Sequence, residues 1–280
     1  MRWAWVFLLF TACVNPLAAL RLEKPLEIER HRLLLKHDGT LPEDVARLER
    51  AVEKALPVLA EWGGLAEPVT VFLVNDHDAL EEAVHRPGYS WLRAWGRYDE
   101  IIFQAPSTWT RRDEPVDQLV LHELSHCLLF QRSASKKDWL EKEIPLWFRE
   151  GMAISIARQA NQYPNPVDSG AWLMKNPTLD VFKDGEALSQ DRSAEVYAVG
   201  FHAFVFLENQ SGREKIVAIM DAMRSGETFE AAFARTIGVS VDAFRVNFEN
   251  DLKFRAFRYE RRSRIQRPTM GAPATEGQGT

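Results

Sequence analysis

The strongest constraint on the fold is a helix-forming segment in the middle of the chain, which carries the motif His122-Glu123-Leu124-Ser125-His126. Asp113-Glu114-Pro115 places acids and a proline where a helix N-terminus favours them. Apolar residues then recur at helical spacing, at Val116, Leu119, Val120, Leu124 and Leu128. We therefore predict one helix that continues to about Phe130 and holds the whole motif.

The two histidines of this motif suit a metal ion. Residues four apart on a helix lie one turn above one another, so the imidazoles of His122 and His126 can reach the same zinc ion. Glu123 then falls beside the ion, where a carboxylate can take a proton from an attacking water molecule. The pattern predicts one zinc ion per chain and Glu123 as general base. The alternative is a coincidence in which both histidines have structural roles.

A catalytic zinc ion takes three protein ligands and keeps one position open, so a third ligand is needed. Glu150 is the best candidate, because it lies on a second predicted helix that begins at Pro145. We expect the small residues Gly151 and Ala153 to let this helix approach the motif helix closely. The alternative is a Glu150 side chain that faces solvent.

The two segments His122-Glu-Leu-Ser-His126 and Pro145-Leu-Trp-Phe-Arg-Glu150-Gly-Met-Ala resemble the gluzincin, or peptidase MA-like, zinc metallopeptidases. In that family two histidines and a downstream glutamate bind zinc. The resemblance covers roughly residues 65 to 250, but only the motif region is specific. It implies an α+β, zincin-like fold, with an N-terminal mixed sheet, an active-site helix, a helical C-terminal subdomain and a cleft between the two parts.

The resemblance also implies a residue that stabilises the oxyanion. Family members commonly have a tyrosine or histidine on a later helix for this purpose, and Tyr197 is the matching residue. Its hydroxyl can donate to negative charge that develops in the transition state. The alternative is a core tyrosine whose ring packs beside Phe201 and Phe204.

The chain departs from the family pattern in three respects. The gap between His126 and Glu150 is longer than in thermolysin-like enzymes. Ile154 stands four residues after Glu150, where those enzymes have an acid, so a carboxylate that holds a ligand histidine must come from elsewhere. The Gly-x-Met-Glu-Asn motif of the large gluzincin aminopeptidases is absent from the sequence, which argues against an aminopeptidase.

The first residues predict export. A positive start at Met1-Arg2-Trp3, an apolar run from Ala4 to Phe10 and small residues near position 19 are typical of a secretory signal over residues 1-19. The run is shorter than the roughly 20 residues that span a bilayer. We expect a secreted or periplasmic protein. One alternative is an N-terminal helix that packs on the fold, and another is a lipid anchor in a bacterial envelope, because the residues before Cys13 resemble a lipobox.

The predicted export signal also bears on the pairing of the second cysteine, Cys127. If Cys13 is removed or lipidated, Cys127 has no internal partner for a disulfide. We expect Cys127 to be a buried free thiol that packs as a small apolar residue.

The remaining patterns divide the chain into three parts after the signal. We predict an N-terminal α/β subdomain over 22-132, a helical subdomain over 133-260 and a disordered tail over 261-280. In the first part the predicted strands lie within Glu27–Asp38 and at Val69–Val74, Ala94–Arg97 and Glu100–Gln104, the last of which we expect at the sheet edge. In the second part we predict a loop over Asn161–Gly170, followed by helices only.

The sequence favours a zinc-dependent peptidase whose partner is a peptide or protein substrate, docked on the edge strand near Ile101 to Ala105. The net charge of −5 argues against nucleic-acid binding. We expect membrane contact only through an N-terminal lipid anchor. Two alternatives remain: a catalytically silent binding module with the peptidase fold, and a zinc hydrolase of a non-peptide substrate. The sequence makes no prediction of oligomeric state.

Overall fold

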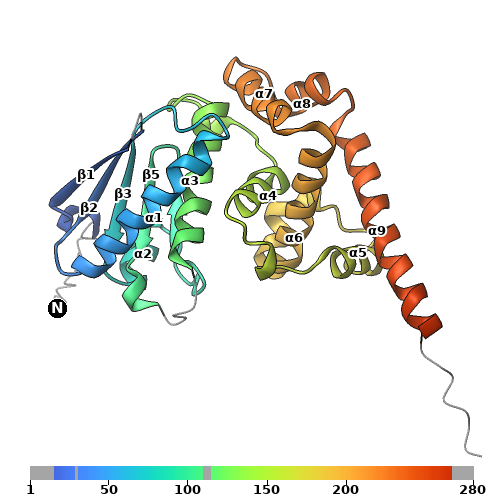
Figure 1. Cartoon of the computed structure of the whole chain (residues 1–280), viewed down its shortest axis with the longest axis horizontal. Coiled ribbons are helices and arrows are strands. Elements are labelled where there is room, and N and C mark those ends of the chain that lie inside the picture. Colours follow the sequence, from blue (N-terminus) through green and yellow to red (C-terminus); the bar gives the residue numbers. More distant parts are fainter. Residues whose placement is uncertain (1–15, 29–30, 110–114, 267–280) are drawn as a thin grey trace, which may run out of the picture.

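The structure, a computed structural model, describes residues 16–28, 31–109 and 115–266. It is an α+β protein, as predicted at that level, with a small mixed sheet followed by a mainly helical part (Figure 1). Residues 1–15, which include Cys13 and most of the predicted signal, lie outside the described residues. Residues 16–19 form the 3-10 turn η1 (Pro16–Ala19), and no helix in the described ranges is long and apolar enough to cross a membrane.

The sheet has five strands among the described residues, in the order β1-β2-β3-β5-β4. Their bounds are β1 (Leu22–Ile28), β2 (His31–His37), β3 (Val69–Val74), β4 (Ala94–Gly96) and β5 (Glu100–Gln104). The inner pairs β2–β3 and β3–β5 are parallel, and the outer pairs β1–β2 and β4–β5 are antiparallel.

The strand at the edge next to β5 is β4, so the prediction that Glu100–Gln104 forms the edge is wrong. Residues 101–104 are all buried, as a strand with neighbours on both sides and helices on both faces requires. The chain enters through β4 and turns directly back into β5, which pairs with β3 on its other side. Strand length alone therefore did not indicate the position in the sheet.

Helices cover both faces of the sheet because the strand side chains alternate in direction. Val71, Ile101 and Phe103 belong to one large core shared with α1 (Pro42–Ala60) and α3 (Val116–Ser133). Ile102 points the other way, into a smaller core shared with α2 (His77–Val84). The large core continues into the helical part, so α3 lies between the sheet and the helices that follow (Figure 1).

The helical part contains six α-helices among the described residues. Their bounds are α4 (Leu146–Ile156), α5 (Pro166–Lys175), α6 (Val181–Ser211), α7 (Arg213–Arg224), α8 (Phe229–Ile237) and α9 (Val241–Gln266). The predicted loop over Asn161–Gly170 is wrong in its second half, because Asn165 caps α5 by accepting hydrogen bonds from the N–H groups of Val167 and Asp168. Helix α9 reaches Gln266, so residues 261–266 are helical where we predicted the tail; residues 267–280 are not described.

The small residue Gly151 of α4 faces α6 and not α3. A Cβ atom at Gly151 would lie 2.5 Å from the carbonyl oxygen of Gly200 and 2.7 Å from the Cβ atom of Phe204, both on α6. The predicted role of Gly151 is therefore wrong. The absence of a side chain at Gly151 lets α4 lie close to α6, while Glu150 on the same helix reaches the histidines of α3.

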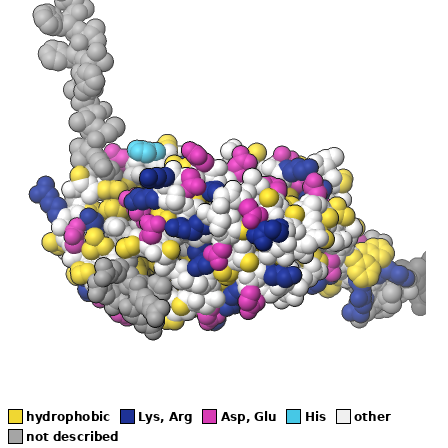
Figure 2. All heavy atoms as spheres, turned by 90° about the horizontal axis from the view of Figure 1, so that it is seen from above, with side chains coloured by type: hydrophobic (Ala, Val, Ile, Leu, Met, Phe, Trp, Pro, Cys, Tyr) yellow, Lys and Arg dark blue, Asp and Glu magenta, His cyan; other side chains and the backbone are white. Residues whose placement is uncertain are grey.

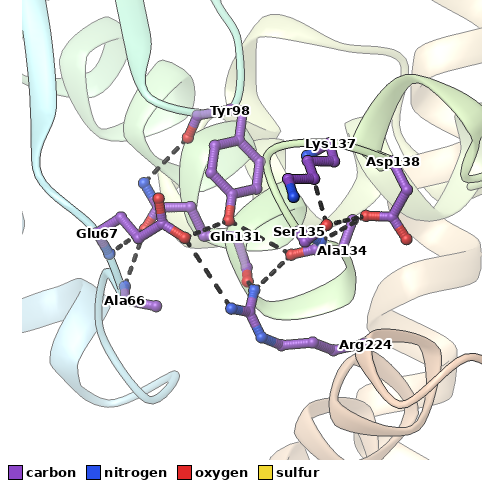
Figure 3. A network of polar contacts seen from close by, with 9 residues as sticks. All are labelled: Ala66, Glu67, Tyr98, Gln131, Ala134, Ser135, Lys137, Asp138 and Arg224. Atoms are coloured by element: carbon purple, nitrogen blue, oxygen red, sulfur yellow. Dashed lines mark hydrogen bonds and ion pairs between the residues drawn. The ribbon is translucent and has the colours of Figure 1, made fainter.

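The end of α3 is fastened by a network of polar groups in which Gln131 and Tyr98 are buried (Figure 3). The fully buried side chain of Gln131 accepts hydrogen bonds from the N–H groups of Ala66 and Glu67 and donates one to the carbonyl oxygen of Tyr98. The Tyr98 hydroxyl donates to Glu67 at 2.6 Å. These contacts fix the last turns of α3 relative to the segment before β3 and to the β4–β5 turn.

Arg224 connects the helical part of the protein to this network. From the last turn of α7, its guanidinium donates to the carbonyl oxygens of Gln131 and Ala134, where helix α3 has carbonyls without intrahelical partners (Figure 3). A cation at a helix C-terminus also interacts favourably with the helix dipole.

We expect Arg224→Met to lower the free energy of unfolding by about 1–3 kcal/mol, because two carbonyls lose a charged donor. Urea denaturation followed by circular dichroism measures this. The matched control is Arg255→Met, which removes an exposed pair with Asp251 on α9 and should change stability by less than about 0.5 kcal/mol. Equal effects of the two substitutions would contradict the role of Arg224.

Candidate metal centre

Helices α3 and α4 bring three metal-ligating side chains together. His122 and His126 lie one turn apart on α3, and Glu150 comes from α4. One ligand atom of each residue lies within 4.8 Å of the other two. The Nε2 atoms of the two histidines are 3.2 Å apart, and the Oε2 atom of Glu150 is 3.6 Å from Nε2 of His122 and 3.7 Å from Nε2 of His126.

These distances fit a shared ion better than direct hydrogen bonds to the carboxylate. Ligands at about 2.0–2.1 Å from a tetrahedral zinc ion are separated from one another by about 3.3 Å. The three observed separations lie close to this value, whereas the two distances to Glu150 exceed those of a hydrogen bond. Two imidazoles and one carboxylate form a donor set that holds zinc and other divalent transition metals, so this group can bind a metal ion.

His122 is oriented by Gln159, a residue that the sequence analysis missed. The Nδ1 atom of His122 lies 2.8 Å from Oε1 of Gln159, and both side chains are buried. Because an amide oxygen only accepts, Nδ1 carries the proton and the lone pair of Nε2 faces the other two ligand atoms. A neutral amide thus stands where we expected a carboxylate.

Gln159 reaches this position through the turn that follows α4. Arg158 has a left-handed backbone conformation (φ 56°), and the N–H group of Gln159 donates back to the carbonyl oxygen of Ile154. His126 differs from His122, since its buried Nδ1 atom has no hydrogen-bond partner in the described part of the chain and its ring stacks on Phe130. No local pattern marks Gln159, because a glutamine after a helix end is ordinary in sequence.

We expect Gln159→Leu to weaken metal binding by about 10- to 100-fold, because His122 loses the group that fixes its tautomer and ring angle. Competition for zinc with a chromophoric chelator measures this affinity. Gln162→Leu is the matched control, since Gln162 is exposed and bonds Gln118 rather than a ligand. Unchanged affinity in Gln159→Leu would show that the contact with His122 does not support the ligand.

The protonation states of His126 and Glu150 are suited to metal binding, whereas His122 must give up a proton more readily than its surroundings favour. Burial lowers the pKa of His126 to about 3, so this imidazole is neutral at pH 7. Burial also opposes charge on His122, but a contact with Glu150 and the charges of Glu123 and Glu150 outweigh it and raise the pKa of His122. Burial opposes ionisation of Glu150, yet the two histidines and Arg149 hold its pKa well below the ordinary value. Metal binding requires a carboxylate and displaces protons from imidazoles.

Glu123 lies beside the three ligands and contacts the edge strand. Its Oε2 atom accepts a hydrogen bond of 2.6 Å from the N–H group of Gly96 on β4, and the residue is only 7% exposed. Burial raises the pKa of Glu123 to about 7, against the lowering effects of His122 and the Gly96 N–H group. A carboxylate with a pKa near neutrality can both accept and return a proton.

The contact between Glu123 and β4 requires a glycine at position 96. A Cβ atom there would lie 2.8 Å from the carbonyl oxygen of Glu123 and 2.9 Å from its Oε2 atom. Strand β4 can therefore approach α3 closely enough to hydrogen bond the Glu123 carboxylate only because this position has no side chain.

Tyr197 is close enough to the metal-binding group to interact with it electrostatically. It lies on α6, its ring packs against the large core, and its ring centroid is 6.3 Å from that of Tyr163. Burial and the charge of Glu150 raise the pKa of Tyr197 far above its usual value, so the hydroxyl stays protonated. The role of Tyr197 as a donor to the oxyanion stays a prediction.

Cys127 is a buried free thiol, as predicted. It lies next to His126 on α3, but burial raises the pKa of its thiol well above the ordinary value. A protonated, inaccessible thiol is a poor metal ligand, so Cys127 acts as part of the core.

Comparison with known proteins adds no family to these observations. No family model matches the chain, and no curated protein matches its sequence. The residues of the site are therefore the basis on which a function can be inferred.

Proposed function

We propose that this chain is a zinc-dependent peptidase of the gluzincin type with a zincin-like fold. The observation that carries the proposal is the position of Glu123, a buried carboxylate with a pKa near 7 beside a complete His122, His126 and Glu150 set. A purely structural metal site does not require such an acid next to its ligands. The predicted export signal favours a secreted or periplasmic location for this activity.

The residues of the site can perform the proton transfers of peptide hydrolysis. When bound, zinc would polarise the scissile carbonyl and activate an attacking water molecule. Glu123 takes the proton of that water and returns it to the leaving amine, while the Gly96 N–H group holds its carboxylate in place. The protonated hydroxyl of Tyr197 donates to the oxygen on which negative charge develops.

Strand β4 supports a peptide as the substrate. The Gly96 N–H group points to α3 rather than to β5, and hydrogen-bonding directions alternate along a strand, so the backbone groups of Ala94 point the same way. An extended peptide can add to such an edge and pass in front of Glu123. The docking strand in this proposal is β4, since the segment near Ile101 to Ala105 lies inside the sheet.

The face of the molecule shown in Figure 2 does not favour a nucleic-acid partner. On the face shown in Figure 2, acidic and basic side chains are interspersed with apolar ones. Such a mixed surface does not concentrate the positive charge that phosphate binding needs. The alternatives to a peptidase are the two functions that would use the same metal site, a silent binding module and a hydrolase of a non-peptide substrate.

Incubation of the zinc-loaded protein with a broad peptide mixture, followed by mass spectrometry, tests the proposal. We expect new peptide termini, loss of cleavage after treatment with 1,10-phenanthroline, and recovery when zinc is added back, because the reaction needs the Lewis acid. Zinc binding without cleavage of any peptide would contradict the proposal and favour the binding module. Cleavage of ester substrates alone would favour the non-peptide hydrolase.

A further inference from the structure

Arg149 places a positive charge beside the candidate metal centre. It precedes Glu150 on α4, and its side chain is 24% exposed. Its Nε atom donates to Oε1 of Glu150 at 3.3 Å, on the side of the carboxylate away from the two histidines. The guanidinium therefore lies against the ligand set without facing the histidine nitrogens.

The second partner of Arg149 is replaceable. Its Nη2 atom donates to Oε1 of Glu186 at 2.7 Å, and the Glu186 side chain is 69% exposed on α6. Ion pairs with such exposed side chains contribute little to stability. Because the Arg149 side chain is mostly buried, its charge is costly without an anionic partner. An anionic ligand can serve as that partner in place of Glu186.

The charge balance of the site leaves Glu186 as the partner that an anionic ligand can replace. A divalent cation would be balanced by the carboxylates of Glu123 and Glu150, which leaves the charge of Arg149 matched only by Glu186 at the surface. The charge of Arg149 also acts on the Tyr197 hydroxyl and on His126. Because the Nε atom of Arg149 contacts Oε1 of Glu150, whose Oε2 atom lies with the two histidines, a group bound at Arg149 would lie next to the metal-binding group.

We propose that Arg149 recognises a carboxylate of the substrate, which displaces Glu186 and pairs with the guanidinium within a few bonds of the scissile carbonyl. This inference rests on the proposed peptidase function and narrows its substrate class to peptides with an acidic group near the cleaved bond. Guanidinium and carboxylate groups can form two parallel hydrogen bonds, a geometry that a lysine side chain does not offer. The carboxylate can belong to the C-terminus of a peptide or to an aspartate or glutamate side chain.

Binding of labelled peptides to zinc-loaded Glu123→Gln protein tests this inference without turnover. One pair of fluorescein-labelled alanine–phenylalanine peptides ends in a free acid or an amide, and a second, amidated pair carries glutamate or glutamine near its end. Fluorescence anisotropy should show about tenfold or tighter binding of the acidic member of at least one pair, as a charge-assisted pair provides. Preference in the first pair assigns the C-terminal carboxylate, and preference in the second assigns a side chain.

Two further substitutions in this background separate recognition from folding. Arg149→Gln should abolish the preference, with zinc content measured in the same sample because Arg149 contacts a ligand. Glu186→Gln changes an exposed residue and should increase the preference by removing the competing carboxylate. Equal binding of acidic and neutral peptides in the parent protein would overturn the role of Arg149 and leave the peptidase proposal intact. Failure of every peptide to bind the zinc-loaded protein would overturn both.

Discussion

Glu123→Gln should lower the rate of peptide cleavage by about 10²- to 10⁴-fold while zinc stays bound at one ion per chain. The amide has the shape of the carboxylate, and its oxygen can still accept the hydrogen bond from Gly96, but it cannot take a proton from water. Measurement of kcat on a cleaved peptide, together with elemental analysis of the same protein, separates loss of the base from loss of the metal.

The control for this substitution is Glu141→Gln. Glu141 is an exposed acid in the connection between α3 and α4, so its replacement should leave both kcat and zinc content unchanged. If Glu123→Gln kept most of the activity, another group would have to be the base, and the main support for the peptidase proposal would be lost.

The second large effect is expected at the ligands. His126→Ala and Glu150→Ala should each weaken zinc binding by about 10²- to 10³-fold, because a binding free energy of roughly 10–16 kcal/mol is shared among a few ligands. Zinc should also raise the melting temperature of the wild-type protein, since it binds the folded state, and should do so far less in the two variants. Calorimetric titration with zinc and thermal denaturation measure the two effects.

Glu143→Ala is the matched control for the ligand substitutions. Glu143 is an exposed acid in the same connection as Glu141. The Glu143→Ala protein should therefore bind zinc as tightly as the wild type does. Full zinc binding by Glu150→Ala would show that the third ligand comes from another residue, and would contradict the arrangement of α3 and α4 described above.

The elements with strong local patterns could be predicted from sequence alone. The strand at Val69–Val74 has the predicted bounds, because its β-branched residues lie between a proline and the Asn75-Asp76 turn. Helix α3 spans the predicted motif helix, since its apolar spacing is regular on both sides of the histidines. Strand β1 was not predicted, because its sequence alone does not indicate a strand. Its pairing with β2 in an antiparallel hairpin stabilises the extended conformation.

The errors concern which surfaces meet. The edge position of β4, the contact of Gly151 with α6 and the start of α5 after its cap Asn165 each depend on a neighbour or on a cap rather than on the residues of one repeating pattern. Short strands and single small residues have the same local signature in several tertiary arrangements. Packing against the rest of the chain selects among them.

For the site, helical periodicity is enough to place His122 and His126 on one face and Glu123 beside them, because their spacing within one helix does not depend on the rest of the fold. The approach of Glu150, the amide of Gln159 behind His122 and the backbone N–H group of Gly96 at Glu123 come from tertiary structure. These groups lie on separate elements that only long-range packing brings within a few ångströms, and backbone donors such as Gly96 leave no side chain to read in the sequence.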